Sequence, residues 1–89
     1  TAAREVVVDG SVVGLTRIEY EILTALVTQQ RTVVPRRLLI EQVWGPGWFG
    51  DEHVVDVHVS NLRRKVEQGG AARVLTTVRG VGYRADPPA

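Results

Sequence analysis

The chain has 89 residues, which suffices for one small domain that buries about 60–65% of the surface of its unfolded chain. It is 44% apolar and 24% charged, as in ordinary soluble domains, and without cysteine it has no disulfide or thiolate metal site. The net charge of +1 gives no case for nucleic acid by itself. No apolar run in the sequence approaches the ~18–20 residues of a membrane span, and no stretch of it has the pattern of a signal peptide. Because the chain opens at Thr1 and contains no methionine, we expect a further segment upstream.

The charge is distributed unevenly along the chain. Residues 1–52 contain five Arg and seven Asp or Glu, a net charge of −2. Residues 53–89 contain six Lys or Arg and three Asp or Glu, a net charge of +3. The positive charge is therefore concentrated in the part of the chain that is predicted below to form a long helix and a hairpin.

The first elements predicted are a hairpin and a helix. Two β-branched runs, Glu5 to Val8 and Ser11 to Leu15, flank the turn-forming pair Asp9-Gly10, as in a β-hairpin. Thr16 and Glu19 then have the spacing of a capping box, in which each residue hydrogen-bonds the other. Apolar residues follow at helical spacing, so we expect a first helix from about Arg17 to Gln29.

A second helix is predicted after a short extended link from Arg31 to Val34. Pro35 suits the first turn of this helix, where its missing N–H has no consequence. Its apolar stripe consists of Leu38, Leu39, Val43 and Trp44. The helix is expected to end at the breaker cluster Gly45-Pro46-Gly47, and Arg36-Arg37 is expected to be a solvated pair at its start.

A third and longer helix is predicted from about Glu52 to Gln68. Asp51 is expected to be its N-cap, with Glu52 favourable in the first turn and Gly69-Gly70 at the end.

The last predicted element is a hairpin. Its strands are expected to run from Val74 to Val78 and from Tyr83 to Ala85, around a turn from Arg79 to Gly82, and Pro87-Pro88 is expected to end the domain. A strand pair, three helices and a hairpin, in this order, indicate an α+β winged helix-turn-helix architecture.

The third helix has two faces of different chemistry. The stripe predicted to pack on the other helices consists of Val55, Val59, Leu62 and Val66. The opposite side has His53, Val57, Ser60, Asn61 and Arg64, with Gln68 one turn further. A solvated face is the commoner explanation for such a helix, but Asn, Arg and Val are also suited to read adenine, guanine and the thymine methyl group. The adjacent arginine-tipped hairpin favours the second explanation.

The hairpin turn is also open to two explanations. Arg79 is placed to enter a minor groove, and the glycines beside it allow the backbone to approach a phosphate closely. Thr77 and the Tyr83 hydroxyl are then possible donors to phosphates. In the alternative, this is an ordinary hairpin whose glycines serve only the turn, with Tyr83 in the core.

Several motifs together resemble the winged-helix effector domain of OmpR/PhoB-type bacterial response regulators. Leu15 to Leu23 is similar to LTxxE[FY]xLL, and Arg37 to Gly45 is similar to RxxLLxxVWG. Val55 to Val59 and Leu62 to Lys65 are similar to VDVHIxxLRxKL, and Thr77 to Arg84 is similar to TVRGxGYR. The resemblance covers nearly the whole chain, and four motifs in the right order make it specific.

The resemblance implies that the third helix enters the major groove of DNA and that Arg79 enters the adjacent minor groove. It places these residues at the DNA backbone: Trp44, His53, His58, Arg63, Thr77 and Tyr83. It places these on the groove side: Val57, Ser60, Asn61 and Arg64. In the family, the loop before the third helix touches RNA polymerase. Here this loop is Gly45 to Asp51, and its expected contact residues are Gly47, Trp48, Phe49 and Gly50.

The resemblance further implies a cytoplasmic bacterial transcription regulator without a cofactor. Two copies usually bind direct-repeat half-sites, under the control of an upstream receiver domain that a sensor kinase phosphorylates. Ser60, Asn61 and His53 depart from the pattern, because several members have arginine at these positions. We therefore expect fewer charged contacts here and a different preferred sequence.

Other functions are less well supported by the residues. His53 and His58 are about 140° apart around a helix, so they do not share a metal from one face. No set of nucleophile, base and orienting group indicates an enzyme. His58 is expected to be a core histidine or a phosphate contact, and Asp56 is expected to pair with a nearby arginine.

A protein-interaction module that has lost DNA binding remains the competing class, because the net charge is low and the helix face is weakly basic. Trp48 and Phe49 are expected either to plug the core or to form a partner-binding tip.

Overall fold

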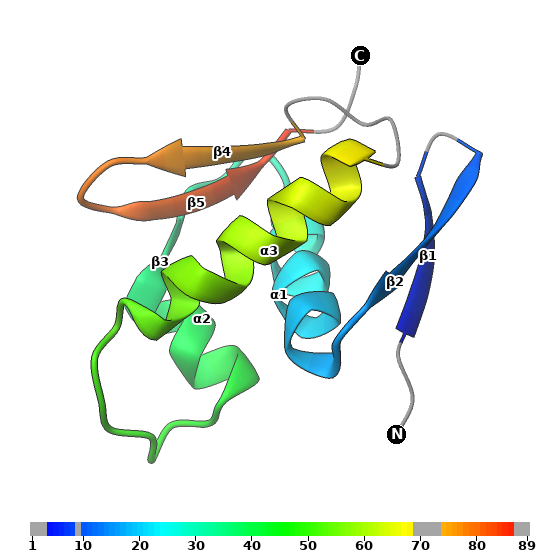
Figure 1. Ribbon diagram of the computed structural model, residues 1–89. Coiled ribbons are helices and arrows are strands. Elements are labelled where there is room, and N and C mark those ends of the chain that lie inside the picture. Colours follow the sequence, from blue (N-terminus) through cyan, green and yellow to red (C-terminus); the bar gives the residue numbers. More distant parts are fainter. Residues whose placement is uncertain (1–3, 9, 69–73, 87–89) are drawn as a thin grey trace.

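The structure, a computed structural model, describes residues 4–8, 10–68 and 74–86. The described residues form five strands and three helices, in the predicted order but with one additional short strand. Their bounds are β1 Arg4–Val8, β2 Ser11–Leu15, α1 Arg17–Thr28, β3 Val34–Pro35, α2 Arg36–Val43, α3 Val54–Gln68, β4 Leu75–Val78 and β5 Gly82–Ala85. Figure 1 shows α3 in front of the other helices, with the β4–β5 hairpin on one side and the β1–β2 hairpin on the other.

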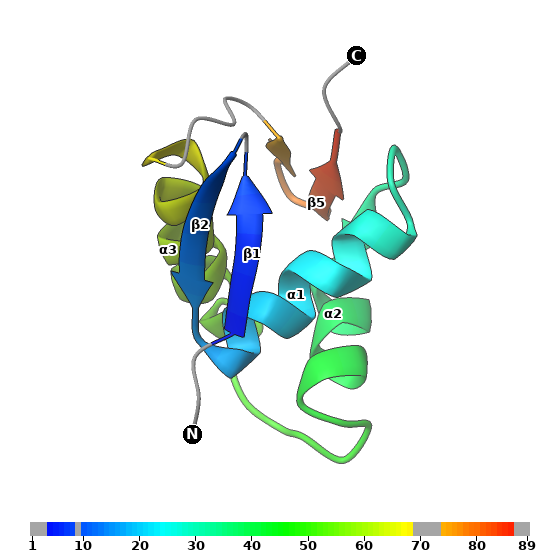
Figure 2. The same cartoon turned by 90° about the vertical axis from the view of Figure 1, so that its right-hand side faces the viewer.

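The N-terminal hairpin confirms the prediction. Strands β1 and β2 pair antiparallel in a register that places Val6 opposite Val13. Side chains of β2 alternate between the core and solvent: Val13 and Leu15 are buried, whereas Val12 is 64% exposed. Figure 2 shows the hairpin from the front, with α3 on one side of it and α1 on the other. Asp9, in the predicted turn, lies outside the described residues.

Helix α1 begins with the predicted capping box. The Thr16 N–H donates to Glu19 Oε1 at 3.0 Å, and the Glu19 N–H donates to Thr16 Oγ1 at 3.2 Å. The helix ends at Thr28, with Gln29 as its C-cap. Ile22 and Leu26 are fully buried, and each such side chain contributes about 1.5–3 kcal/mol of hydrophobic stabilisation.

The link after α1 differs from the predicted extended segment. Residues 29–32 turn, and Arg31 adopts the left-handed region with φ 66. The Arg31 N–H donates to the carbonyl oxygen of Ala85 at 2.8 Å, which ties this turn to the last strand.

A third strand, which the sequence did not reveal, follows this turn. Val34 pairs with Tyr83 and Pro35 pairs with Gly82, so β3 forms one edge of a three-stranded sheet in the order β3-β5-β4. Pro35 therefore precedes α2 instead of lying in its first turn. Two residues are too few to show the alternation by which strands are recognised.

Helix α3 begins two residues later than predicted. Residues 52 and 53 form a tight turn, and the Asp51 carboxylate accepts the His53 N–H at 2.9 Å before the helix begins. Asp51 thus caps this turn and not α3 itself. The predicted stripe is confirmed, because its four members are each 3% exposed or less: Val55, Val59, Leu62 and Val66. The predicted end at Gly69-Gly70 lies outside the described residues.

The C-terminal hairpin, called the wing below, comprises β4, β5 and the turn at residues 79–81. Gly80 has φ +75, so it does serve the turn as expected. Gly82 belongs to β5 and not to the turn, since it pairs with Pro35 and Val78. A Cβ atom at Gly82 would lie 2.1 Å from the carbonyl oxygen of Val34. The glycine at this position therefore permits β3 and β5 to approach each other. Pro87-Pro88 lies outside the described residues.

We expect Gly82→Ala to lower the free energy of unfolding by about 1–3 kcal/mol or more, because β3 must move to admit the methyl group. Gly14→Ala is the matched control, since Gly14 also lies in a strand but has no atom within 4 Å of the added Cβ. Urea denaturation of both variants measures the difference. Equal stability of the two variants would contradict the steric explanation.

Candidate nucleic-acid interface

The side of α3 opposite the buried stripe is open to solvent, as predicted. This surface, called the outer face of α3, consists of Val57, Ser60, Asn61, Arg64 and Gln68 together with His53, which lies in the turn just before the helix. All are exposed except Asn61, which is partly buried. Val57 is 61% exposed although it is apolar, so it is available for an apolar contact outside the domain. The outer face combines amide, hydroxyl, guanidinium and aliphatic groups, the types that read base edges.

The wing lies alongside α3 (Figure 1). Its turn contains Arg79. Arg79 is exposed, and the turn is closed by a hydrogen bond of 3.0 Å from the Val81 N–H to the Val78 carbonyl oxygen. Val81 is 48% exposed beside it. The wing and the outer face of α3 are therefore adjacent surfaces, each with one exposed arginine.

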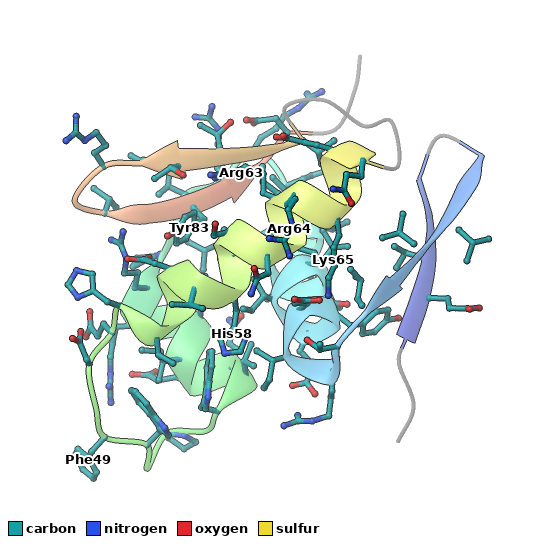
Figure 3. The ribbon with its side chains drawn as sticks, viewed as in Figure 1. Phe49, His58, Arg63, Arg64, Lys65 and Tyr83 are labelled. Atoms are coloured by element: carbon teal, nitrogen blue, oxygen red, sulfur yellow. The ribbon has the colours of Figure 1, made fainter. Side chains whose placement is uncertain are left out.

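Three consecutive basic residues of α3 have different environments (Figure 3). Arg63 points toward the wing, where its Nη2 donates to Thr77 Oγ1 at 2.6 Å. Lys65 points toward α1, and Arg64 lies between them on the outer face. Of these three, only Arg64 is exposed, so the basic character of the sequence here is mostly directed to internal contacts.

Lys65 is paired with a buried carboxylate, which the sequence did not indicate. Its Nζ donates to Glu19 Oε1 at 2.7 Å, and the Glu19 side chain is 3% exposed. Burial acts to raise the pKa of Glu19, but the hydrogen bonds from Lys65 and Thr16 outweigh it and hold the pKa below its ordinary value. Glu19 therefore joins α1 to α3 in addition to its role in the capping box.

Asp56 is the centre of a second internal network. Its Oδ1 accepts from Arg36 Nε at 2.8 Å and from the Tyr83 hydroxyl. The Arg36 guanidinium also lies 5.3 Å from the centroid of the Tyr83 ring, within range of a cation–π contact. Asp56, Tyr83 and Arg36, together called the Asp56 junction below, connect α3, β5 and α2.

The Asp56 junction settles three sequence expectations. The predicted pairing of Asp56 with an arginine is confirmed, and Arg36 is not a solvated residue, because its side chain is 18% exposed. Arg37 does remain at the surface, paired with Glu41. Tyr83 is 4% exposed, which agrees with the alternative that places it in the core.

The pKa values within the junction reflect this pairing. Burial acts to raise the pKa of Asp56, but the hydrogen bonds from Tyr83 and Arg36 outweigh it and lower the pKa. Burial, reinforced by the bond to Asp56, raises the pKa of the Tyr83 hydroxyl. The hydroxyl therefore stays protonated and keeps donating to Asp56.

The aromatic residues of the α2–α3 loop separate into an anchor and a tip. Trp44 and Trp48 pack on the core with ring centroids 6.0 Å apart, and the His58 ring lies 5.6 Å from that of Trp44. A Cβ at Gly50 would lie 2.6 Å from the Trp48 ring, so glycine permits this packing. Phe49 is 88% exposed at the far end of the loop (Figure 3). Trp48 thus fits the expectation of a core plug, whereas Phe49 fits that of a partner-binding tip.

His53 also has a local partner. Its Nδ1 lies 2.7 Å from Asp51 Oδ1 and its ring is exposed at the start of the outer face. Among the described residues, no three His, Asp or Glu side chains are placed to hold a metal ion. In the same ranges no helix is both long and apolar enough to cross a bilayer.

Comparison with known proteins supports the motif analysis. The family model described as "Transcriptional regulatory protein, C terminal" matches residues 10–85. The chain belongs to this family of OmpR/PhoB-type effector domains. The family is one of transcription regulators and not of enzymes.

Among curated proteins, the DNA-binding response regulator MtrA of Mycolicibacterium smegmatis is 45% identical over 87 residues, which is 97% of this chain and 38% of MtrA. The transcriptional regulatory protein PrrA of Mycobacterium tuberculosis is 46% identical over 76 residues, which is 85% of this chain and 33% of PrrA. The chain therefore spans less than two fifths of the length of these relatives.

Solved structures agree with the winged-helix fold. The DNA-binding domain of Klebsiella pneumoniae RstA in complex with the RstA box has a TM-score of 0.81 at 30% identity, covering 96% of this chain and 85% of that one. The AdeR DNA-binding domain in complex with an intercistronic region has a TM-score of 0.77 at 38% identity, covering 86% of this chain and 76% of that one.

We expect Lys65→Met to lower the free energy of unfolding at pH 7 by about 1–3 kcal/mol, because the buried Glu19 carboxylate loses its cationic partner. In the parent protein the depressed pKa of Glu19 gives stability above pH ~4.3 that is lost as pH falls through the folded-state pKa. The difference in the free energy of unfolding between the parent and Lys65→Met should therefore decrease as the pH is lowered from 7 to 3, and urea denaturation measures it. Arg37→Met, which breaks the exposed pair with Glu41, is the control. An equal loss of the free energy of unfolding in both variants would contradict the role of Lys65 as partner of the buried Glu19.

Proposed function

We propose that this domain binds double-stranded DNA in a sequence-specific manner as part of a transcription regulator, with α3 in the major groove and Arg79 of the wing in the minor groove. The observation that carries the proposal is the exposed outer face of α3 with the arginine-tipped wing beside it. A helix about 10–12 Å wide fits a major groove about 12 Å wide. The similar RstA and AdeR domains, whose structures are DNA complexes, support the same proposal.

We assign base contacts to four residues of the outer face: Val57, Ser60, Asn61 and Arg64. Asn61 supplies the amide that suits adenine, Arg64 supplies the guanidinium that suits guanine, and Val57 is exposed enough to meet a thymine methyl group. Ser60 is also exposed, and its hydroxyl can form a hydrogen bond with a base-edge donor or acceptor.

Contacts to the DNA backbone are assigned to residues at the edges of this surface: Trp44, His53, His58, Arg63 and Thr77. Thr77 accepts a hydrogen bond from Arg63, so its own hydroxyl proton remains available for a phosphate oxygen. The family resemblance also places Tyr83 at the DNA backbone, but here its hydroxyl donates to Asp56. We therefore assign Tyr83 a role in holding the wing and not a phosphate contact.

The longer protein that contains this domain is proposed to be a response regulator, as the names of the MtrA relatives indicate for those proteins. An upstream receiver domain, phosphorylated by a sensor kinase, then controls the pairing of two copies on direct-repeat half-sites in the bacterial cytoplasm. In that scheme this domain supplies the DNA-binding part.

The α2–α3 loop is proposed to be a contact for RNA polymerase. Trp48 anchors the loop on the core and Gly50 allows that packing, so Phe49, between Trp48 and Gly50 in the chain, is held 88% exposed, with Gly47 two positions before it. An aromatic side chain presented in this way is typical of a protein-binding hot spot.

We expect Arg79→Ala to weaken binding to a selected duplex and to flatten its salt dependence, because a cationic contact to DNA is lost. Asn61→Ala should instead relax base preference at one position, with a loss of about 1–3 kcal/mol on the preferred duplex. Selection from a random duplex library followed by fluorescence anisotropy measures both effects. Arg17→Ala, on α1, is the control and should bind as the parent does.

Two outcomes would oppose this proposal. Unchanged affinity and base preference in both variants would remove these residues from the interface. No enriched sequence, even with a dimerised domain, would favour the competing explanation of a protein-interaction module.

We expect Phe49→Ala to leave duplex affinity unchanged and to reduce transcription in vitro from a promoter that carries the selected site, because the exposed aromatic contact is removed. Val12→Ala is the control, since Val12 is also an exposed apolar residue but lies on the N-terminal hairpin. Equal transcription by the parent and Phe49→Ala would remove the loop from the polymerase contact.

A further inference from the structure

The Asp56 junction lies between the two surfaces that are proposed to touch DNA. Asp56 is on the flank of α3, between the buried stripe and the outer face, and its side chain is 33% exposed. Tyr83 lies in β5, paired with Thr77 of β4 on one side and with Val34 of β3 on the other. A single carboxylate oxygen, Asp56 Oδ1, thus accepts from the wing and from the start of α2.

The wing is held to the rest of the domain mainly along β5. The Arg36 N–H donates to the Val81 carbonyl oxygen at 3.4 Å, and the Arg36 side chain contacts both Asp56 and the Tyr83 ring. On the opposite strand, Thr77 receives a hydrogen bond from Arg63 at an exposed edge, where water or phosphate competes for it. The Tyr83–Asp56 bond is less accessible to such competition than the Arg63–Thr77 bond, because its donor Tyr83 is buried.

We propose that Asp56 is a positioning residue for DNA binding: through Tyr83 and Arg36 it fixes the wing relative to α3, so that helix and wing meet DNA as one preformed unit. This inference rests on the proposed function. A wing that is already ordered loses less conformational freedom on binding. The contact of Arg79 with DNA then contributes fully to the binding free energy. If the wing is not held by Asp56, it must become ordered on binding DNA, and the net contribution of Arg79 to the binding free energy decreases.

Tyr83→Phe tests this proposal because it removes only the hydroxyl and keeps the ring beneath Arg36. In the parent, Arg79→Ala is expected to weaken duplex binding about 10-fold or more. In the Tyr83→Phe background the same change should have an effect at least ~3-fold smaller, which is a coupling that a double-mutant cycle measures. Asp56→Asn, combined with Arg79→Ala, should show coupling of the same sign.

Two controls separate positioning from simple loss of stability. Asn61→Ala should have the same fold-effect with and without Tyr83→Phe, because Asn61 belongs to α3 itself. Thr76→Val removes a wing hydroxyl that bonds Asp86 at 2.6 Å and not α3, so its cycle with Arg79→Ala should show no coupling. A general loss of folded protein would scale every affinity equally and would produce no coupling in any cycle.

Hydrogen exchange in the free protein gives a readout that does not involve DNA. Tyr83→Phe should speed exchange of the Val81 amide, which closes the wing turn, and leave the amides of α1 unchanged. Unchanged Val81 exchange together with an Arg79→Ala effect of equal size in both backgrounds would overturn the inference while leaving the proposed function intact. If Arg79→Ala has no effect in the parent, the proposed function fails at the wing, and the inference fails with it.

Discussion

The structure depends on one constraint, which is that α3 must be buried on one side and free on the other. Four aliphatic side chains of α3 are almost completely removed from solvent: Val55, Val59, Leu62 and Val66. Because they recur at helical spacing, they fix the rotation of α3 about its own axis. That rotation determines that Val57, Asn61 and Arg64 face outward, so the core selects the residues of the proposed DNA-binding surface.

The outer face of α3 and the wing have few exposed charged residues, because several others form internal ion pairs. Lys65 neutralises the buried Glu19 and thereby joins α3 to α1, whereas Arg36 neutralises Asp56 and joins α2 to α3. Arg64 and Arg79 remain exposed on the outer face and the wing. Two exposed arginines of a domain with net charge +1 thus lie on the surfaces that are proposed to meet two adjacent grooves. Because Ser60 and Asn61 are uncharged, the proposed interface depends at these positions more on base contacts than on general attraction to phosphate.

Local features of the fold were predictable from the sequence, because each depends on residues a few positions apart. The Thr16–Glu19 capping box, the first hairpin and the stripe of α3 follow from spacing alone. The pairing of Lys65 with Glu19 joins residues 46 positions apart, and nothing in the pattern around either residue specifies the other. Strand β3 has two residues and depends on the approach of β5, so its sequence carries no signal of its own.

The candidate site was predictable to a similar degree. Helical periodicity and the family motifs identified the outer face and the wing arginine. They did not reveal that Arg36 is internal or that the Tyr83 hydroxyl is bound to Asp56, because motif similarity gives positions and not hydrogen-bond partners. The glycine at position 82 was likewise assigned to the turn, whereas the carbonyl of Val34 is what requires it.

The central claim is that the outer face of α3 and the wing form one DNA-binding surface. An NMR titration of the labelled domain with a selected duplex tests it most directly. The largest amide shifts are predicted at Val57, Asn61, Arg64 and Gly80, with small shifts at Val12 on the N-terminal hairpin. Shifts concentrated on the N-terminal hairpin, or absent from both α3 and the wing, would contradict the claim.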